Sequence, residues 1–304
     1  MRVSTRNEYG TLKRVIVGSA EQATWPTDDP EFEAMMSRST YPGKLTRGPL
    51  PDKVRQEATA DLDAFSKLLE SEGVIVHRPT ITKPTWSYSA RDILLTAGEH
   101  LIECPTPFSS RVNEAEHYPF LTTVECKWTK APRPVSKHDP MFDAANVLKL
   151  DDKLLYSVTH SANEAGAVWL QEVVGTDFEV VAWKGVENQI THIDSTLVSL
   201  AKDTILVNGN RINDDNLPSF MRHYKKIIVD DPVPRQFETF PFASKWIGIN
   251  ILSINDNTVV VDPIQTGLID KLEQEGFKVL LAPLRQSRTL GGGHHCTTCD
   301  LERG

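Results

Sequence analysis

A weak internal repeat constrains the fold of this chain more than any other feature of its sequence. Each copy consists of a polar residue, an apolar run, a turn and a second apolar run, which is the pattern of a β-hairpin. The copies begin at Asp92, Asp143, Asp194 and Ser244, which are 51, 51 and 50 residues apart, and Cys296 follows Ser244 by 52 residues. This spacing predicts one structural module repeated along the chain.

A helix and a further strand are expected after each hairpin. Apolar residues recur at intervals of three and four between positions 54 and 69, which is typical of an amphipathic helix, and an apolar strand at 74–78 follows them. The same order of helix and strand recurs at 169–174 and at 268–281. The predicted module is therefore ββαβ.

Five such modules would account for most of the 304 residues. We expect radial repetition about a central axis, because it protects the sheet edges and places the first residue of each hairpin near that axis. The predicted fold class is α/β, a five-bladed pseudo-symmetric α/β propeller that forms a single domain over 1–304. Hairpins often begin with Asp for structural reasons alone, so the period by itself does not establish that the leading residues form a shared site.

Two segments interrupt the repeat. Residues 24–52 contain five prolines and few apolar residues. This segment fits either a lid over the central pocket or a surface Ω-loop without a catalytic role. Residues 105–140, which are also rich in proline, are predicted to form a second long irregular segment.

Composition restricts the partners of the protein. Lys and Arg number 33 and Asp and Glu 41, for a net charge of −8, and there is no long basic run. We therefore expect no nucleic-acid surface, whereas a cationic small molecule is favoured. No apolar stretch is long enough to span a membrane, and the first residues lack the apolar core of a signal peptide, which predicts a cytoplasmic protein without a membrane segment. The sequence is compatible with a homodimer and does not determine the oligomeric state.

The segment 290–299 combines three glycines, two histidines and two cysteines. Zinc could use His294, His295, Cys296 and Cys299, but four ligands within six residues can hardly surround one tetrahedral ion. Cys296-x-x-Cys299 also has the spacing of a redox pair, although that motif normally opens a helix. A nucleophilic Cys296 is the third interpretation. It requires a histidine and a carboxylate from elsewhere in the chain, and in a chain without secretory signals the cysteines are expected to be reduced.

The leading residues of the repeat supply these partners. Strand alternation would place His192 and Asp194 on the same face, although a single histidine is more often structural. A guanidinium substrate would suit this set, because Asp92 and Asp194 could grip its N–H edges while Cys296 attacks its carbon. His192, oriented by Asp143, would protonate the departing amine and later take a proton from the incoming nucleophile. This chemistry needs no cofactor and no metal.

Five runs occur in order along the chain. They are Arg91-Asp92-Ile93-Leu94, Phe142-Asp143-Ala144-Ala145, His192-Ile193-Asp194-Ser195-Thr196, Ser244-Lys245-Trp246 and Gly291-Gly292-Gly293-His294-His295-Cys296-Thr297-Thr298-Cys299-Asp300. Together they resemble the amidinotransferase family, which includes arginine:glycine and inosamine-phosphate amidinotransferases and belongs to the guanidino-group-modifying superfamily.

The resemblance implies a five-bladed propeller and an amidino-cysteine intermediate on Cys296, with His192 and Asp143 as the other catalytic residues. It also implies that Asp92, Asp194 and Ser244 bind substrate and that Arg211 binds a substrate carboxylate. The expected reaction moves the amidino group from L-arginine, the donor, to a small primary amine and releases L-ornithine. A deiminase-like hydrolase of the same superfamily, in which water resolves the intermediate, is the alternative.

The sequence departs from the glycine-accepting members at positions around the expected pocket. Ala243 replaces a serine, His294 replaces an aromatic apolar residue, and Thr297 replaces a tryptophan. Gln189-Ile190-Thr191 stands where those members carry Asn-Pro-Met. These changes leave the donor chemistry intact and put glycine as the acceptor in doubt.

Overall fold

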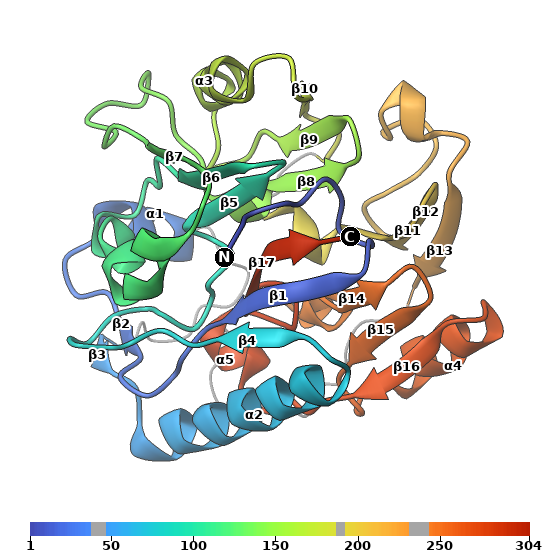
Figure 1. The fold of residues 1–304 in the computed structure, drawn as a ribbon, viewed down its shortest axis with the longest axis horizontal. Helices are drawn as coiled ribbons and strands as arrows, with labels where there is room; N and C mark the ends of the chain where they lie inside the picture. Colours follow the sequence, from blue (N-terminus) through green and yellow to red (C-terminus); the bar gives the residue numbers. More distant parts are fainter. Residues whose placement is uncertain (38–46, 187–191, 231–242) are drawn as a thin grey trace.

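The computed structural model describes residues 1–37, 47–186, 192–230 and 243–304. Within these residues the strands form five separate three-stranded sheets and one two-stranded sheet. The molecule is a mixed α/β protein, and its longer helices lie at the periphery (Figure 1). Among the described helices, none has the length and apolar composition that crossing a membrane would require.

Four of the sheets are built from consecutive strands. In each, an antiparallel hairpin is followed by a third strand that pairs in parallel with the second strand of the hairpin. Many of the hairpin residues are buried and apolar, as is usual for strands covered on both faces. The strands are β5 (Leu94–Ala97), β6 (His100–Glu103) and β7 (Lys127–Lys130); β8 (Val147–Leu150), β9 (Lys153–Ser157) and β10 (Glu179–Trp183); β11 (Leu197–Ala201), β12 (Thr204–Asn208) and β13 (Lys225–Val229); and β14 (Leu252–Asn255), β15 (Thr258–Val261) and β16 (Lys278–Leu281).

The fifth sheet joins the two ends of the chain. β1 (Leu12–Val17) pairs antiparallel with β17 (Thr298–Arg303) and parallel with β4 (Ile75–His77). Both chain ends therefore lie near this sheet, towards the middle of Figure 1. Because β17 starts two residues after Cys296, the N-terminal strand helps to position the candidate nucleophile.

The predicted helices at 54–69 and 169–174 are confirmed as parts of α2 (Asp52–Ser71) and α3 (Glu164–Val174). The helix predicted at 268–276 is confirmed as α4 (Thr266–Gln274), which ends two residues earlier. The expectation of an α-helix in every module was wrong. Between β6 and β7, and between β12 and β13, the described chain forms only short 3-10 turns. Prolines in both connections, including Pro119 and Pro218, lack the N–H that a helix interior needs.

The segment 24–52 is more ordered than its composition indicated. It contains β2 (Thr24–Trp25), β3 (Gly48–Pro49) and α1 (Pro30–Ser37), while residues 38–46 lie outside the described part. Pro30 occupies the first position of α1, where its missing N–H costs nothing, and the Asp29 carboxylate accepts a hydrogen bond from the Phe32 amide at 3.1 Å. Phe32 and Met35 are buried, so an irregular surface loop is the wrong description of this part.

Candidate active site

Cys296 lies at the buried end of the glycine-rich turn between α5 (Ser287–Leu290) and β17. Gly291 has a φ of 77°, a left-handed conformation that favours glycine. A side chain at Gly293 would place its Cβ 2.5 Å from the Asn250 carbonyl oxygen, so this position also requires glycine. The amides of Gly293 and Cys296 both donate to Asn250 Oδ1, at 3.0 and 2.9 Å. The turn is thus fixed by one asparagine from the neighbouring module.

Two polar groups contact the thiol of Cys296. Its Sγ lies 3.0 Å from Asp194 Oδ2, to which the thiol donates, and it accepts a hydrogen bond from Asn250 Nδ2 at 3.3 Å. Asp194 belongs to a 3-10 turn at Ile193–Ser195 and not to a strand, so the strand alternation expected for His192 and Asp194 was wrong. The turn still directs the Asp194 carboxylate to the cysteine.

His192 joins two further aspartates to the site. Its Nε2 lies 3.1 Å from Asp143 Oδ2, and its Nδ1 lies 3.7 Å from Asp92 Oδ1. Asp143 is completely buried, and its second oxygen accepts a hydrogen bond from Thr106 Oγ1 at 2.6 Å. Polar side-chain atoms of Asp92, His192 and Cys296 lie within 4.8 Å of one another. The leading residues of four repeats therefore meet, as their spacing predicted.

The charges in the site set opposite proton preferences for the histidine and the cysteine. Burial lowers the pKa of His192, but the carboxylates of Asp92 and Asp143 outweigh it and raise the pKa to about 9. Burial raises the pKa of Cys296 well above 9.0, and the nearby carboxylates of Asp194 and Asp92 raise it further. At neutral pH the site therefore holds an imidazolium beside a neutral thiol.

Arg111 is a site residue that the sequence analysis missed. Its buried guanidinium pairs with Asp92 Oδ2 and with Glu114, and its Nη2 donates to the Ser89 carbonyl at 3.0 Å. The second carboxylate oxygen of Asp92, Oδ1, is buried and has no hydrogen-bond partner among the described residues. Arg111 lies in the irregular segment 105–140, where no period could single it out. Its ion pair leaves one oxygen of Asp92 ready to accept an N–H.

His295 connects the site to the N-terminal segment. Its Nδ1 lies 2.9 Å from Asp194 Oδ2 and its Nε2 lies 3.4 Å from Glu8 Oε2. Burial would raise the pKa of Asp194, but the hydrogen bond and the charge of His295 lower it well below its usual range. The carboxylate next to Cys296 is therefore ionised. The sequence analysis weighed His295 only as a zinc ligand and did not single out Glu8.

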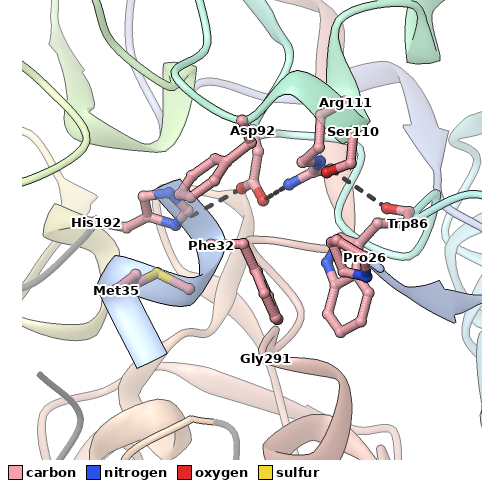
Figure 2. Close-up of a pocket in the computed structure, with 10 residues that line it drawn as sticks. Pro26, Phe32, Met35, Trp86, Asp92, Ser110, Arg111, His192 and Gly291 are labelled. Atoms are coloured by element: carbon pink, nitrogen blue, oxygen red, sulfur yellow. Dashed lines mark hydrogen bonds and ion pairs between the residues drawn. The ribbon is translucent and has the colours of Figure 1, made fainter. Parts of the chain in front are cut away.

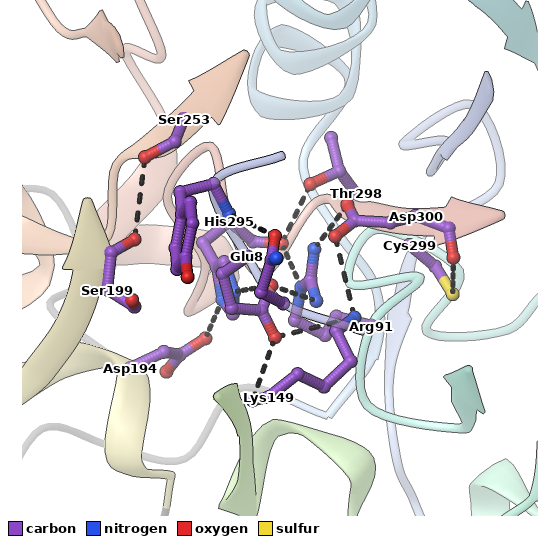
Figure 3. Close-up of polar contacts among 12 residues, drawn as sticks. Glu8, Arg91, Lys149, Asp194, Ser199, Ser253, His295, Thr298, Cys299 and Asp300 are labelled. Carbon is purple, nitrogen blue, oxygen red and sulfur yellow. Dashed lines mark hydrogen bonds and ion pairs between the residues drawn. The ribbon is translucent and has the colours of Figure 1, made fainter. Parts of the chain in front are cut away.

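A buried charge cluster lies behind His295 (Figure 3). Arg91 pairs with Glu8 at 3.4 Å and with Asp300 at 2.9 Å, and Lys149 Nζ lies 3.4 Å from Glu8 and 3.5 Å from Asp300. The side chains of all four residues are at most 5% exposed. Arg91 also donates from Nε to the His295 carbonyl at 2.9 Å, which links the cluster to the cysteine turn.

A pocket opens beside these groups. Figure 2 shows the side chains around it, which come from α1, from the 3-10 turn Ser109–Arg111 and from the segments before β5, β11 and β17. Asp92 and His192 are part of its wall, and the His192 side chain is 17% exposed. The described lining residues are Pro26, Phe32, Met35, Trp86, Asp92, Phe108, Ser110, Arg111, His192 and Gly291.

The four residues weighed as zinc ligands point to different places. His294 Nε2 lies 2.9 Å from the Ala282 carbonyl oxygen, and its ring packs edge-on against Phe65. The thiol of Cys299 donates to the Leu94 carbonyl at 3.4 Å. In the described chain, the one group of three residues close enough to share a metal ion is Asp92, His192 and Cys296, of which Asp92 and His192 line the pocket.

Arg211 and Ser244 have partners outside this pocket. Arg211 Nη1 donates to Thr196 Oγ1 at 2.8 Å, and Ser244 Oγ accepts a hydrogen bond from the Trp246 amide at 3.2 Å. Neither residue is among the described residues that line the pocket. The departure noted at 189–191 falls outside the described residues.

Known proteins resemble this chain in sequence and in fold. No family model matches the chain. Inosamine-phosphate amidinotransferase 1 of Streptomyces glaucescens is 36% identical over 337 aligned positions, which cover 99% of this chain and 97% of that protein. The L-arginine:L-lysine amidinotransferase of Pseudomonas savastanoi pv. phaseolicola is 28% identical, with 99% and 94% coverage. The solved structure of an inosamine-phosphate amidinotransferase from Streptomyces griseus superposes with a TM-score of 0.91 at 36% identity, covering 99% of this chain and 97% of that one.

Proposed function

This chain belongs to the amidinotransferase family, and we propose that it transfers the amidino group of L-arginine to a small primary amine and releases L-ornithine. One observation carries the proposal. Asp92, His192 and Cys296 bring a carboxylate, an imidazole and a thiol within 4.8 Å of one another at a pocket wall. Such a group can bind a planar cation, attack its carbon and protonate its leaving nitrogen.

Asp92, through the oxygen that accepts no hydrogen bond from the described residues, and the ionised Asp194 would bind the guanidinium of the donor. Asp92 Oδ1 is buried without a hydrogen-bond partner among the described residues, and Asp194 Oδ2 lies 3.0 Å from the sulfur. A guanidinium held between them would offset both charges and lower the pKa of Cys296, so that the thiol releases its proton to solvent when the donor binds. We also propose that Arg211 pairs with the carboxylate of the donor and that Ser244 contacts substrate.

The covalent steps follow from these positions. The Cys296 thiolate forms a C–S bond to the guanidinium carbon of the donor. The bond between that carbon and Nε of arginine breaks, and its electron pair stays on the nitrogen, which becomes the side-chain amine of ornithine. His192, protonated at neutral pH and paired with Asp143, supplies the proton to the leaving amine. The acceptor amine then forms a C–N bond to the same carbon, gives a proton to His192, and returns the sulfur as thiolate.

We further propose that the five three-stranded sheets are the blades of a propeller formed by the single domain 1–304. The repeated order of a hairpin and a parallel third strand supports this arrangement, as does the sheet that joins the two chain ends. The meeting of side chains that lead four of the repeats also supports it, because radial repetition brings equivalent positions to one axis.

The test follows the fate of arginine. Incubation with arginine alone, followed by acid quenching and mass spectrometry, should show an amidino group on the peptide that contains Cys296, with release of ornithine. Asp143→Asn should slow this half-reaction by about 10²–10⁴-fold. An unmodified cysteine in an active preparation would rule out the covalent mechanism. Release of citrulline and ammonia without any amine would identify the hydrolase instead.

A further inference from the structure

We propose that the acceptor is a primary amine on an apolar carbon skeleton, held against the wall that α1 contributes to the pocket. This inference rests on the proposed function and specifies its second substrate. It excludes phosphorylated and polyhydroxylated amines as the preferred acceptors. The apolar wall is defined by Phe32 and Met35 of α1 together with Pro26, Trp86 and Phe108.

The position of the acceptor follows from the chemistry. Its nitrogen must reach the amidino carbon on Cys296, and His192 must take a proton from that nitrogen. The His192 side chain is part of the pocket wall, and Cys296, which is buried and is not itself a lining residue, offers its sulfur within 4.8 Å of it. The carbon skeleton of the amine therefore extends from His192 into the space beside Phe32 and Met35, which Figure 2 shows near His192 and Asp92.

The wall in that space is apolar and fixed. Phe32, Met35, Trp86 and Phe108 are each at most 8% exposed and belong to one hydrophobic core or line its edge. Side chains packed into a core keep one position, so they offer a formed surface to a ligand. Polyhydroxylated carbon atoms on this surface would lose their hydrogen bonds to water without replacement.

The charges in the pocket disfavour a phosphate. Arg111 is the one Lys or Arg among the described lining residues, and its guanidinium already pairs with Asp92 and Glu114. Asp29 adds another buried carboxylate, which accepts hydrogen bonds from the amide and hydroxyl of the lining residue Ser110 at 3.0 and 2.7 Å. The imidazolium of His192, the other cation of the described wall, already pairs with Asp143. A phosphate would therefore meet carboxylates and cations that are already paired, whereas an ammonium group is attracted by the carboxylates.

The first experiment measures kcat/KM for a panel of amines with arginine as donor. Linear alkylamines from propylamine to hexylamine share nearly the same basicity, so differences in kcat/KM along the series report the effect of carbon-chain length. We expect kcat/KM to rise about fourfold per methylene until the wall is filled. Hexylamine should exceed glycine and glucosamine 6-phosphate by at least about tenfold. A flat series, or a preference for glycine or glucosamine 6-phosphate, would overturn the inference.

The second experiment compares two adjacent methionines of α1. Met35 lines the pocket, whereas Met36 is partly buried against the same core and is not part of the lining. Met35→Ser should lower kcat/KM for hexylamine about tenfold while changing that for propylamine less than about twofold. Met36→Ser, which removes a similar side chain from the same helix, should leave the hexylamine to propylamine ratio unchanged. Equal ratios in both variants would contradict the assignment of the wall.

Formation of the amidino-enzyme separates the two proposals. If arginine alone modifies Cys296 and releases ornithine but the alkylamine series is flat, the acceptor inference is wrong and the proposed function stands. If arginine neither modifies Cys296 nor releases ornithine, the proposed function is wrong, and the acceptor inference fails with it.

Discussion

At the scale of single residues, Cys296 is placed in surroundings that oppose its ionisation. Asp194 and Asp92 both raise the pKa of the thiol, and burial acts in the same direction. The same two carboxylates favour a bound cation. Under the proposed mechanism, ionisation of Cys296 would therefore be coupled to binding of the guanidinium, and without a donor the thiol would stay protonated and unreactive.

This coupling predicts a pH dependence for the thiolate. Because the pKa of Cys296 lies well above 9.0 in the free enzyme, the thiol should stay protonated at neutral pH and ionise only as the pH rises past that value. Guanidinium ion at a concentration that does not denature the protein should lower the apparent pKa by about 1–3. Ultraviolet absorbance of the thiolate, taken as the difference between wild type and Cys296→Ser, measures both. Full ionisation of Cys296 at pH 7 without guanidinium would contradict the prediction.

The buried charge cluster predicts a large cost for losing one of its members. Arg91→Met leaves Glu8 and Asp300 with fewer partners in the interior, and we expect the free energy of unfolding to fall by about 3–5 kcal/mol. Arg2→Met is the matched control, because the side chains of Arg2 and its partner Glu99 are 60% and 51% exposed. That variant should lose less than about 1 kcal/mol. Urea unfolding measures both losses, and equal losses would show that burial does not set the cost.

Residues that lead a repeat, and His192 beside one of them, could be found from the sequence, whereas Arg111 and Glu8 could not. Asp92, Asp143, Asp194 and Cys296 share a spacing, and the structure brings them to one site. Arg111 lies in a connection without periodicity, and its contact with Asp92 depends on how that connection packs. Glu8 is still more distant in sequence, since it contacts His295 across 287 residues.

At the scale of elements, β17 connects the turn that carries Cys296 to the rest of the molecule. Leu301, in the middle of this strand, is fully buried in a core cluster with Val3, Ile16 and Leu94. The strand thus packs against both the N-terminal segment and β5. The rigidity of the cysteine turn depends on this packing as well as on Asn250.

Shortening the buried side chain of β17 should destabilise the protein. We expect Leu301→Ala to lower the free energy of unfolding by about 2–5 kcal/mol, since it leaves a cavity in a closed core. Leu281→Ala on β16 is the control, because Leu281 is 53% exposed and should lose no more than about 0.5 kcal/mol. Both values come from urea unfolding. A loss at Leu301 as small as at Leu281 would mean that β17 contributes little to the fold.

Helical elements were predictable where an apolar stripe marked them. The helices α2, α3 and α4 follow such stripes, whereas α1 was missed because its short sequence lies among prolines. The 3-10 turns after β6 and β12 were also missed. A three-residue turn has no period, and its conformation depends on the sheets that it joins.

At the scale of the whole molecule, one sheet unites residues from the two ends of the chain. Ile16 of β1 lies opposite Cys299 of β17 in the antiparallel ladder. β1 and β17 are not consecutive in the chain, whereas each of the other four three-stranded sheets is built from consecutive strands. The turn that carries Cys296 is therefore stabilised by a pairing that forms only when distant segments meet.

Hydrogen exchange should reveal this pairing. We expect the backbone amides of β1 and β17 to exchange with the same opening free energy and the same dependence on denaturant, because they belong to one ladder. The Val135 amide is the control, since Val135 is 90% exposed and its N–H bonds only to the nearby Asp139 side chain, so it should exchange far faster. If the amides of β17 exchanged with a lower opening free energy than those of β1, the two strands would not open as one unit, and the prediction would be wrong.

The sequence by itself determined the repeated module, the long helices and the residues that could bind and attack a guanidinium. These depend on local propensity and on spacing, which a linear pattern records. Tertiary structure alone decided that Arg111 occupies one oxygen of Asp92, that His295 joins Glu8 to Asp194, and that α1 forms an apolar wall beside His192. Such contacts join residues far apart in the chain, and their energies depend on burial and charge after packing, so no local pattern encodes them.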